Sequence, residues 1–227
     1  YSSAIFPEKN SSLETASEHK LEQICQKLEL KPSDHVIEIG TGWGGFAIYA
    51  ATHYGCKITT TTISAEQFSL ANERIQRAGL SEQIKVKLTD YRNLTGQFDK
   101  LVSIEMIEAV GHQFYDTYFS KCSRLLKPDG LMLLQAITMS DWIFDAHKRT
   151  VDFIKRYIFP GSCIPSISAI CESMSKETDL RIVDLLDIGP HYARTLRLWR
   201  ERFFASINVV REQGFNEEFI RMWHFYL

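Results

Sequence analysis

A glycine-rich segment after the first apolar run is the part of the sequence best suited to hold a ligand. Gly40, Gly42 and Gly45 follow the run 36–39 and satisfy the spacing GxGxxG. Glycines between a strand and a helix let the backbone turn sharply and let a ligand approach it closely. The spacing is the dinucleotide fingerprint, but alone it is a weak indicator, because a tight turn without a ligand shows the same pattern.

The placement of acidic residues indicates which cofactor this turn suits. A nicotinamide dinucleotide needs a carboxylate about 20 residues after the glycines, at the end of the second strand. Segment 59–62 at that place contains only threonine, whereas Glu38 lies two residues before Gly40. This pattern resembles motif I of class I methyltransferases, whose glycines pack against the methionine and ribose parts of S-adenosylmethionine. We therefore expect S-adenosylmethionine as the cofactor.

Short apolar runs alternate with helical segments over the first part of the chain. Strands are predicted at 35–40, 57–63, 84–88, 98–104 and 131–137, with helices at 43–54, 64–78 and 106–126. This alternation is typical of βαβ units and a parallel sheet. The strands are apolar almost throughout, as expected when helices cover both faces. The predicted fold class is α/β, with a Rossmann-like, mostly parallel sheet.

The pattern changes after residue 140. Segment 141–161 is aromatic and charged, and we interpret it as a helical lobe inserted over the active face. A helix at 166–178, a strand at 180–188, and helices at 192–213 and 216–226 are predicted to follow. We interpret residues 1–227 as a single domain. Because the chain starts without Met and shows no final strand, we expect a fragment of a longer protein.

Composition excludes several classes of protein. With 44% hydrophobic residues, the chain is too apolar for intrinsic disorder. Its net charge of −2 and pI of about 6.4 argue against a general nucleic-acid binder. The five cysteines include no CxxC pair, which favours free thiols in a reducing compartment and no metal site. No apolar run approaches the roughly 20 residues that a membrane-spanning helix needs, so a cytoplasmic protein is expected.

Six motifs in order extend the resemblance along the chain. They are YSSAIF at 1–6, TTISAEQ at 61–67, DYR at 90–92, SIEMIEAVG at 103–111, YIFPG at 157–161 and YARTLRLW at 192–199. Together they resemble the cyclopropane-fatty-acyl-phospholipid synthase and mycolic acid cyclopropane synthase family, which belongs to the class I methyltransferases. Six motifs are far more specific than one glycine turn.

The resemblance assigns a set of residues to S-adenosylmethionine. They are Tyr1 and Ser2, which would close over it, Gly40 and Gly42, which would line it, Thr62, Ile63 and Gln67 on its ribose and adenosine side, and Tyr91 and Ile104 beside the adenine. Tyr91 is equally compatible with an ordinary loop aromatic.

The resemblance also implies a pocket that holds a bicarbonate ion beside the substrate double bond. Its members would be Glu108, Tyr192, Ser3, Gln135 and the backbone of Ile137. The family usually has Cys in place of Ser3 and His in place of Gln135. Serine and glutamine keep hydrogen-bonding groups there. Methyl transfer to an alkene leaves a carbocation, so a base such as bicarbonate must remove a proton before a ring closes.

Some of these side chains also have ordinary structural explanations. A carboxylate at Glu108 suits the first turn of a helix because of the helix dipole. Tyr192 would fill the core, and His112 suits a surface or core position. Glu105 is expected to lie near the cofactor through its backbone, without a chemical role.

The implied substrate is an unsaturated phospholipid at the membrane surface, and the implied product is a cis-cyclopropane fatty acid. The basic side chains of the lobe are Lys148, Arg149, Lys155 and Arg156. They would contact anionic headgroups, although a solvated helix face explains them almost as well. The alternatives are a methyl-branching lipid methyltransferase, a small-molecule N- or O-methyltransferase, and a catalytically silent cofactor- or lipid-binding module. A nicotinamide oxidoreductase is disfavoured by segment 59–62, nucleic acid is not an expected partner, and a homodimer is left open.

Overall fold

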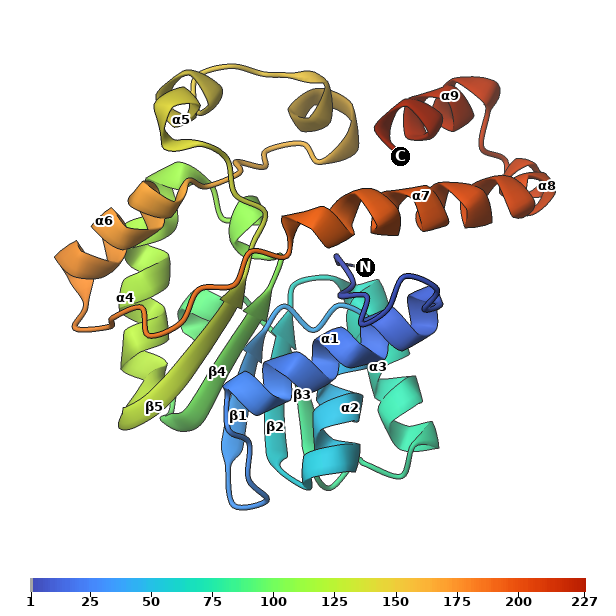
Figure 1. Cartoon of the computed structure of the whole chain (residues 1–227). Helices are drawn as coiled ribbons and strands as arrows, with labels where there is room; N and C mark the ends of the chain where they lie inside the picture. Colours follow the sequence, from blue (N-terminus) through green and yellow to red (C-terminus); the bar gives the residue numbers. More distant parts are fainter. Residues whose placement is uncertain (1) are drawn as a thin grey trace.

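A computed structural model describes residues 2–227 and contains a parallel sheet covered by helices (Figure 1). The strands are β1 (His35–Ile39), β2 (Lys57–Thr62), β3 (Ile84–Leu88), β4 (Phe98–Ile104) and β5 (Leu126–Gln135). Their order across the sheet is β3-β2-β1-β4-β5, and each pairing is parallel. The predicted α/β fold class with a Rossmann-like sheet is therefore confirmed.

Helices cover the two faces of the sheet in two groups (Figure 1). One face carries α1 (Leu13–Lys27), α2 (Gly45–Tyr54) and α3 (Ala65–Arg77), and the other carries α4 (Tyr115–Leu125) and α6 (Ile167–Glu177). Successive residues of β1 serve the two cores, because Val36 packs with the first group and Ile37 with the second. Burial on both faces explains the apolar sequence of β1, whereas β2 buries the four threonines of segment 59–62.

The connections of the sheet create a crevice at its carboxyl edge. From β1 the chain continues outward to β2 and β3, then crosses back to β4 on the other side of β1. The loops after β1 and β4 therefore diverge, and ligands of such sheets bind outside the carboxyl ends at this switch point. The glycine turn follows β1, and segment 105–111 follows β4, so both predicted functional motifs lie at this crevice.

A layer of helices lies beyond the carboxyl ends of the strands (Figure 1). Segment 141–161, predicted as the lobe, contains α5 (Asp141–His147) and a π-helix at Ile154–Ile158. The chain then continues from α6 into α7 (Gly189–Ala205), α8 (Ile207–Glu212) and α9 (Glu217–Tyr226). The rings of Phe153 and Phe225, 4.8 Å apart, join the lobe to α9. Over residues 2–227, no helix has both the length and the apolar character needed to cross a membrane.

The prediction of a strand at 180–188 is wrong. This segment has no regular secondary structure, and its apolar side chains, including Val183 and Leu185, are exposed. A β-branched run forms a stable strand only where a neighbouring strand pairs with it and a core covers one face. Within the described chain neither condition holds for this segment.

Two helix predictions were too long, and one helix was missed. The predicted helix 106–126 is divided at Gly111, whose φ of 84° interrupts helical geometry, into two 3₁₀ turns and α4. The predicted helix 192–213 is divided at Ser206 into α7 and α8. Helix α1 was not predicted, although Ser12 caps it by accepting a hydrogen bond from the Thr15 N–H.

Candidate functional site

The glycine turn after β1 leaves open space beside the backbone. Gly42 has a φ of 51°, and a Cβ placed there would meet nothing within 4 Å. Gly40 has a φ of 102°, and a Cβ there would lie 3.2 Å from Cγ of Met106, in the loop after β4. The first glycine therefore allows the two loops to touch, and the second leaves room for a ligand. Gly44 is the N-cap residue of α2 and has a φ of 80°.

Glu38 supplies an unpaired acceptor directly before this turn. Its side chain is only 3% exposed, and Oε2 has no hydrogen-bond partner among the described residues. Burial raises the pKa of the Glu38 carboxyl to about 8, because desolvation disfavours the charged form. A buried polar atom without a partner requires an explanation, and a ligand that donates a hydrogen bond there would provide one.

Lys20 brings a buried cation to the same crevice. It lies on α1, is 6% exposed, and its Nζ donates a hydrogen bond to Oγ of Ser2 over 2.5 Å. Sequence analysis did not single out this residue. A signal was present, because Lys20 interrupts the otherwise apolar buried stripe of α1 formed by Leu13, Ala16 and Ile24.

These three features fit S-adenosylmethionine. Its methionyl part carries an ammonium and a carboxylate, which are complementary to an acid and a cation held close to a glycine turn. Ser2, predicted to contact the cofactor, is positioned by Lys20 at this point. Tyr1, predicted to close over the cofactor, lies outside the residues that the structure describes.

The residues predicted for the ribose and adenosine side lie at the end of β2 and the start of α3. The Thr62 hydroxyl donates a hydrogen bond to Oε1 of Gln67 over 2.7 Å, which holds the Gln67 amide at the carboxyl edge. Ile63 between them is 79% exposed. Ser64 accepts a hydrogen bond from the Gln67 N–H, so it caps the N-terminus of α3.

The residues predicted for the adenine follow β3 and end β4. Tyr91 is half-buried and packs edge-on against Tyr118, with the ring centroids 5.6 Å apart. Asp90 accepts hydrogen bonds from the backbone N–H and the guanidinium of Arg92, so its carboxylate is turned toward its own loop. Ile104 is the last residue of β4 and is partly buried.

Two carboxyl groups in the loop after β4 hold predicted pocket residues, and the first is that of Glu108. The Ile137 N–H donates to Oε1 of Glu108 over 2.6 Å, which brings two of the predicted pocket residues together. Oε2 of Glu108 is buried and has no partner within residues 2–227. Burial raises the pKa of the Glu108 carboxyl to about 7, and the nearby charge of Glu105 acts in the same direction. Glu108 is therefore poised to hold a proton near neutral pH.

The second carboxyl group is that of Glu105, for which the sequence predicted no chemical role. The Ser3 N–H and Nε2 of Gln135 each donate to Oε1 of Glu105 over 2.8 Å. Nε2 of Gln135 also donates to the carbonyl oxygen of Ser3, 3.4 Å away. The structure thus brings predicted residues Ser3 and Gln135 together, but around a carboxylate of the chain itself.

Tyr192 lies on α7, one of the helices beyond the carboxyl ends of the strands. Its hydroxyl is 3.1 Å from the hydroxyl of Tyr226 on α9, and its ring packs edge-on against Trp199. The N-terminal segment contacts the same helix, since the Ala4 N–H donates to Oγ1 of Thr195 over 3.2 Å. Helix α7 therefore holds both Tyr192 and the segment that carries Ser2 and Ser3.

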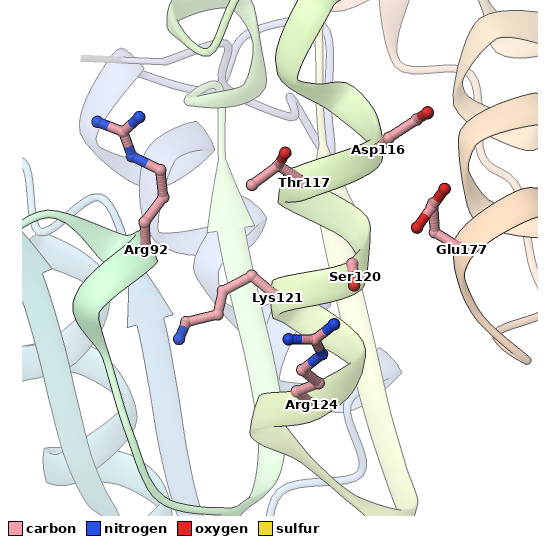
Figure 2. A pocket seen from close by; sticks show the side chains of 7 residues that line it. All are labelled: Arg92, Asp116, Thr117, Ser120, Lys121, Arg124 and Glu177. Atoms are coloured by element: carbon pink, nitrogen blue, oxygen red, sulfur yellow. The ribbon is translucent and has the colours of Figure 1, made fainter.

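The hollows on the outer surface belong to other regions. One of about 460 Å³ lies against α4 and includes Arg92, Lys121, Arg124, Asp116 and Glu177 (Figure 2). Figure 2 shows the cations on one side and the two carboxylates on the other, without a common point toward which they converge. This hollow contains none of the predicted site residues.

Comparisons with known proteins find relatives along the whole chain. The family model described as mycolic acid cyclopropane synthetase matches residues 1–227. Tuberculostearic acid methyltransferase UfaA1 of Mycobacterium tuberculosis is 42% identical over 217 residues, which cover 96% of this chain and 51% of that protein. Cyclopropane-fatty-acyl-phospholipid synthase of Escherichia coli K12 is 41% identical over 231 residues, which cover all of this chain and 56% of that protein. The chain thus spans about half the length of these curated relatives.

A solved structure is similar over the whole chain. The structure of mycolic acid cyclopropane synthase CmaA1 complexed with SAH and CTAB superposes with a TM-score of 0.91 at 29% identity. The match covers 100% of this chain and 82% of that one.

Proposed function

Because this chain belongs to the mycolic acid cyclopropane synthetase family, we propose that it modifies the double bond of an unsaturated phospholipid acyl chain with S-adenosylmethionine as the methyl donor. The proposed product is a cyclopropane fatty acid. The name of the Escherichia coli relative, a cyclopropane-fatty-acyl-phospholipid synthase, supports this choice of substrate and product.

One structural relationship carries the proposal. The turn that leaves room for a ligand and the loop that carries Glu105 and Glu108 touch each other, because Gly40 lies against Met106 between the two acids. A methyl donor held at the turn would therefore lie beside groups able to accept a proton. Ring formation needs these two elements together, because the transferred methyl group must lose a proton.

The chemistry explains what the residues must do. S-adenosylmethionine supplies a methyl group on a positively charged sulfur. An alkene is a poor nucleophile, so holding the two reactants in line contributes much of the rate. Ser2, Lys20 and the glycine turn would fix the donor, and the helices beyond the carboxyl edge would exclude water. Half-buried Tyr192 presents an aromatic face of the kind that stabilises a cation.

Exposed apolar side chains on the lobe support contact with a membrane surface. Trp142 is 85% exposed and Val151 73% exposed, and Tyr157 is half-exposed. Arg156 belongs to the same lobe and holds its guanidinium over the Tyr157 ring, and Arg149 is exposed. A surface that combines aromatic, aliphatic and cationic side chains suits the interface of an anionic bilayer. We propose that this lobe surface docks on the membrane that holds the substrate.

A methyl-branched product is the second candidate, since UfaA1, 42% identical, is named a methyltransferase. Both products would come from the same carbocation. Loss of a proton from the transferred methyl group closes the ring, and loss from an adjacent chain carbon leaves a branched alkene.

The experiment that separates these outcomes uses the purified protein, methyl-labelled S-adenosylmethionine and vesicles of unsaturated phospholipid, followed by mass analysis of the acyl chains. Gain of one CH₂ with loss of the double bond supports cyclopropanation. The same gain with a retained double bond supports branching. Tight cofactor binding without label in the lipid contradicts both lipid assignments.

A further inference from the structure

The hydrogen-bond donors expected to hold a bicarbonate ion are already used by carboxylates of the chain. The Ser3 N–H and Nε2 of Gln135 both donate to Oε1 of Glu105 over 2.8 Å. The Ile137 N–H donates to Oε1 of Glu108 over 2.6 Å. An added anion would have to displace these bonds and would lie beside two acidic groups, which disfavours it electrostatically. The residues present therefore do not fit a bicarbonate ion.

The backbone at Glu105 is unusual in a way that points to function. Its φ is 48°, in the left-handed region that glycine prefers and that costs other residues about 1 kcal/mol or more. The Glu105 N–H donates to the carbonyl oxygen of Gln135 over 2.7 Å, which ties this conformation to the end of β5. Such strain persists where the surroundings fix it, and it is concentrated at active sites. Here it directs a carboxylate toward the N-terminal segment.

We propose that the carboxylate of Glu105 is itself the general base of the reaction. It would take the place of the bicarbonate ion that the family resemblance implies. This inference rests on the proposed function. In the first step the π electrons of the alkene form a C–C bond to the methyl carbon, the C–S bond breaks, and S-adenosylhomocysteine leaves as a neutral thioether. The other alkene carbon becomes a carbocation.

The second step closes the ring. A Glu105 carboxylate oxygen takes one proton from the transferred methyl group, and the electrons of that C–H bond form the second C–C bond to the cationic carbon. The proton then passes from the Glu105 carboxyl group to solvent. The net change is one CH₂ added to the alkene and one proton released, so no oxidant, reductant or further anion is needed.

The contacts of Glu105 suit a base that is held in place next to a second carboxyl group. Oε1 of Glu105 accepts hydrogen bonds from two N–H donors, which hold the carboxyl group in place. The buried cation Lys20 lies near enough for its charge to interact with that of Glu105. Glu108, in the short 3₁₀ turn that follows Glu105, is the group whose pKa burial raises to about 7. Two carboxyl groups whose environments differ in this way divide the roles of base and proton holder.

The first arm of the test is Glu105→Gln in the full chain, with Glu73→Gln as the matched control. Glu73 is exposed on α3 and lies outside the site. The glutamine side chain of the first variant keeps an acceptor for both donors but loses basicity. Turnover should fall on the order of 10²- to 10⁴-fold, the usual contribution of a general base, with S-adenosylmethionine affinity unchanged by calorimetry. Retained turnover in Glu105→Gln would overturn the proposal.

The second arm does not depend on the lipid substrate. Glu105→Gly relieves the positive φ and frees the Ser3 and Gln135 donors, so it should bind ¹³C-bicarbonate in an NMR titration, whereas the wild-type protein should not. Bicarbonate should also restore part of the turnover of Glu105→Gly, and carbon-dioxide-free buffer should leave wild-type turnover unchanged. Bicarbonate binding by the wild-type protein as strong as that of the variant would overturn the proposal.

The two arms separate the inference from the proposed function. If the wild-type protein labels no lipid, the proposed substrate is contradicted. Exclusion of bicarbonate by the wild-type protein and its binding by Glu105→Gly would still support replacement of the anion by Glu105.

Discussion

The Lys20 ammonium donates a hydrogen bond to the Ser2 hydroxyl over 2.5 Å, which links a buried cation of α1 to the N-terminal segment at the site. The salt bridges of the described chain do not include Lys20. A buried ammonium that has a neutral hydroxyl as its partner is poorly compensated for lost hydration. Glu105 and Glu38 are near enough for their charges to act on Lys20, but neither forms a salt bridge with it. The carboxylate of the methionyl part of S-adenosylmethionine would supply a direct ion-pair partner.

Replacing Lys20 with methionine, which is similar in length but uncharged, should weaken S-adenosylmethionine binding by about tenfold or more, since a hydrogen bond to a charged group contributes roughly 1.5–3 kcal/mol. Calorimetry measures the affinity of each variant for S-adenosylmethionine. Binding of 5′-methylthioadenosine, which lacks the carboxylate and ammonium, should change little. An equal loss of affinity for both ligands would contradict a contact between Lys20 and the carboxylate. Lys9→Met, at an exposed position, serves as the control.

Gly42→Ala should reduce cofactor affinity much more than it reduces stability. Its Cβ would meet no protein atom within 4 Å, but it would project into the space reserved for the ligand. Gly79→Ala is a matched control, because Gly79 has a φ of 70° and equally open surroundings outside the site. Both variants should lose about 1 kcal/mol of unfolding free energy from the strained backbone. Only Gly42→Ala should lose S-adenosylmethionine binding, and equal losses of binding would contradict the assignment of this turn.

The free energy of unfolding should fall as pH rises from about 4.5 to 8, because of Glu38. The folded-state pKa of about 8 lies above the ordinary value of 4.5, so the folded protein binds more protons than the unfolded chain in this interval. The loss is at most about 5 kcal/mol, since a pKa change of one corresponds to about 1.4 kcal/mol. Glu38→Gln should reduce this pH dependence, measured by urea unfolding without cofactor. An unchanged slope in the variant would contradict a buried, neutral Glu38.

Sequence alone predicted the parts of the molecule that depend on local patterns. The first four strands and the glycine turn after β1 each depend on the residue pattern of a short stretch of chain. The strand expected at 180–188 failed because its apolar residues show a preference that only a neighbouring strand could satisfy.

The contacts of Glu105 and Lys20 were missed for a different physical reason. Ser3 and Glu105 are 102 residues apart in the chain, and Ser2 and Lys20 are 18 apart. Their meeting depends on the packing of α1 and α7 around the carboxyl edge, which no local pattern records. A charged residue within a buried helical stripe and an acid in a left-handed conformation become visible as functional candidates only once the fold is known.

Trp142→Ser and Val151→Ser should weaken binding of the protein to vesicles of anionic phospholipid without lowering cofactor affinity. Both side chains are exposed on the lobe, and each would bury apolar surface on docking, with Trp142 losing more, about tenfold or greater. Val183→Ser is the matched control for Val151→Ser, because Val183 is 74% exposed and Val151 73% exposed, but Val183 lies outside the lobe. Vesicle sedimentation measures the affinity, and the loss for Trp142→Ser should persist at high salt, since it is apolar in origin. If Val183→Ser lowered vesicle binding as much as Val151→Ser did, the membrane contact would not be specific to the lobe.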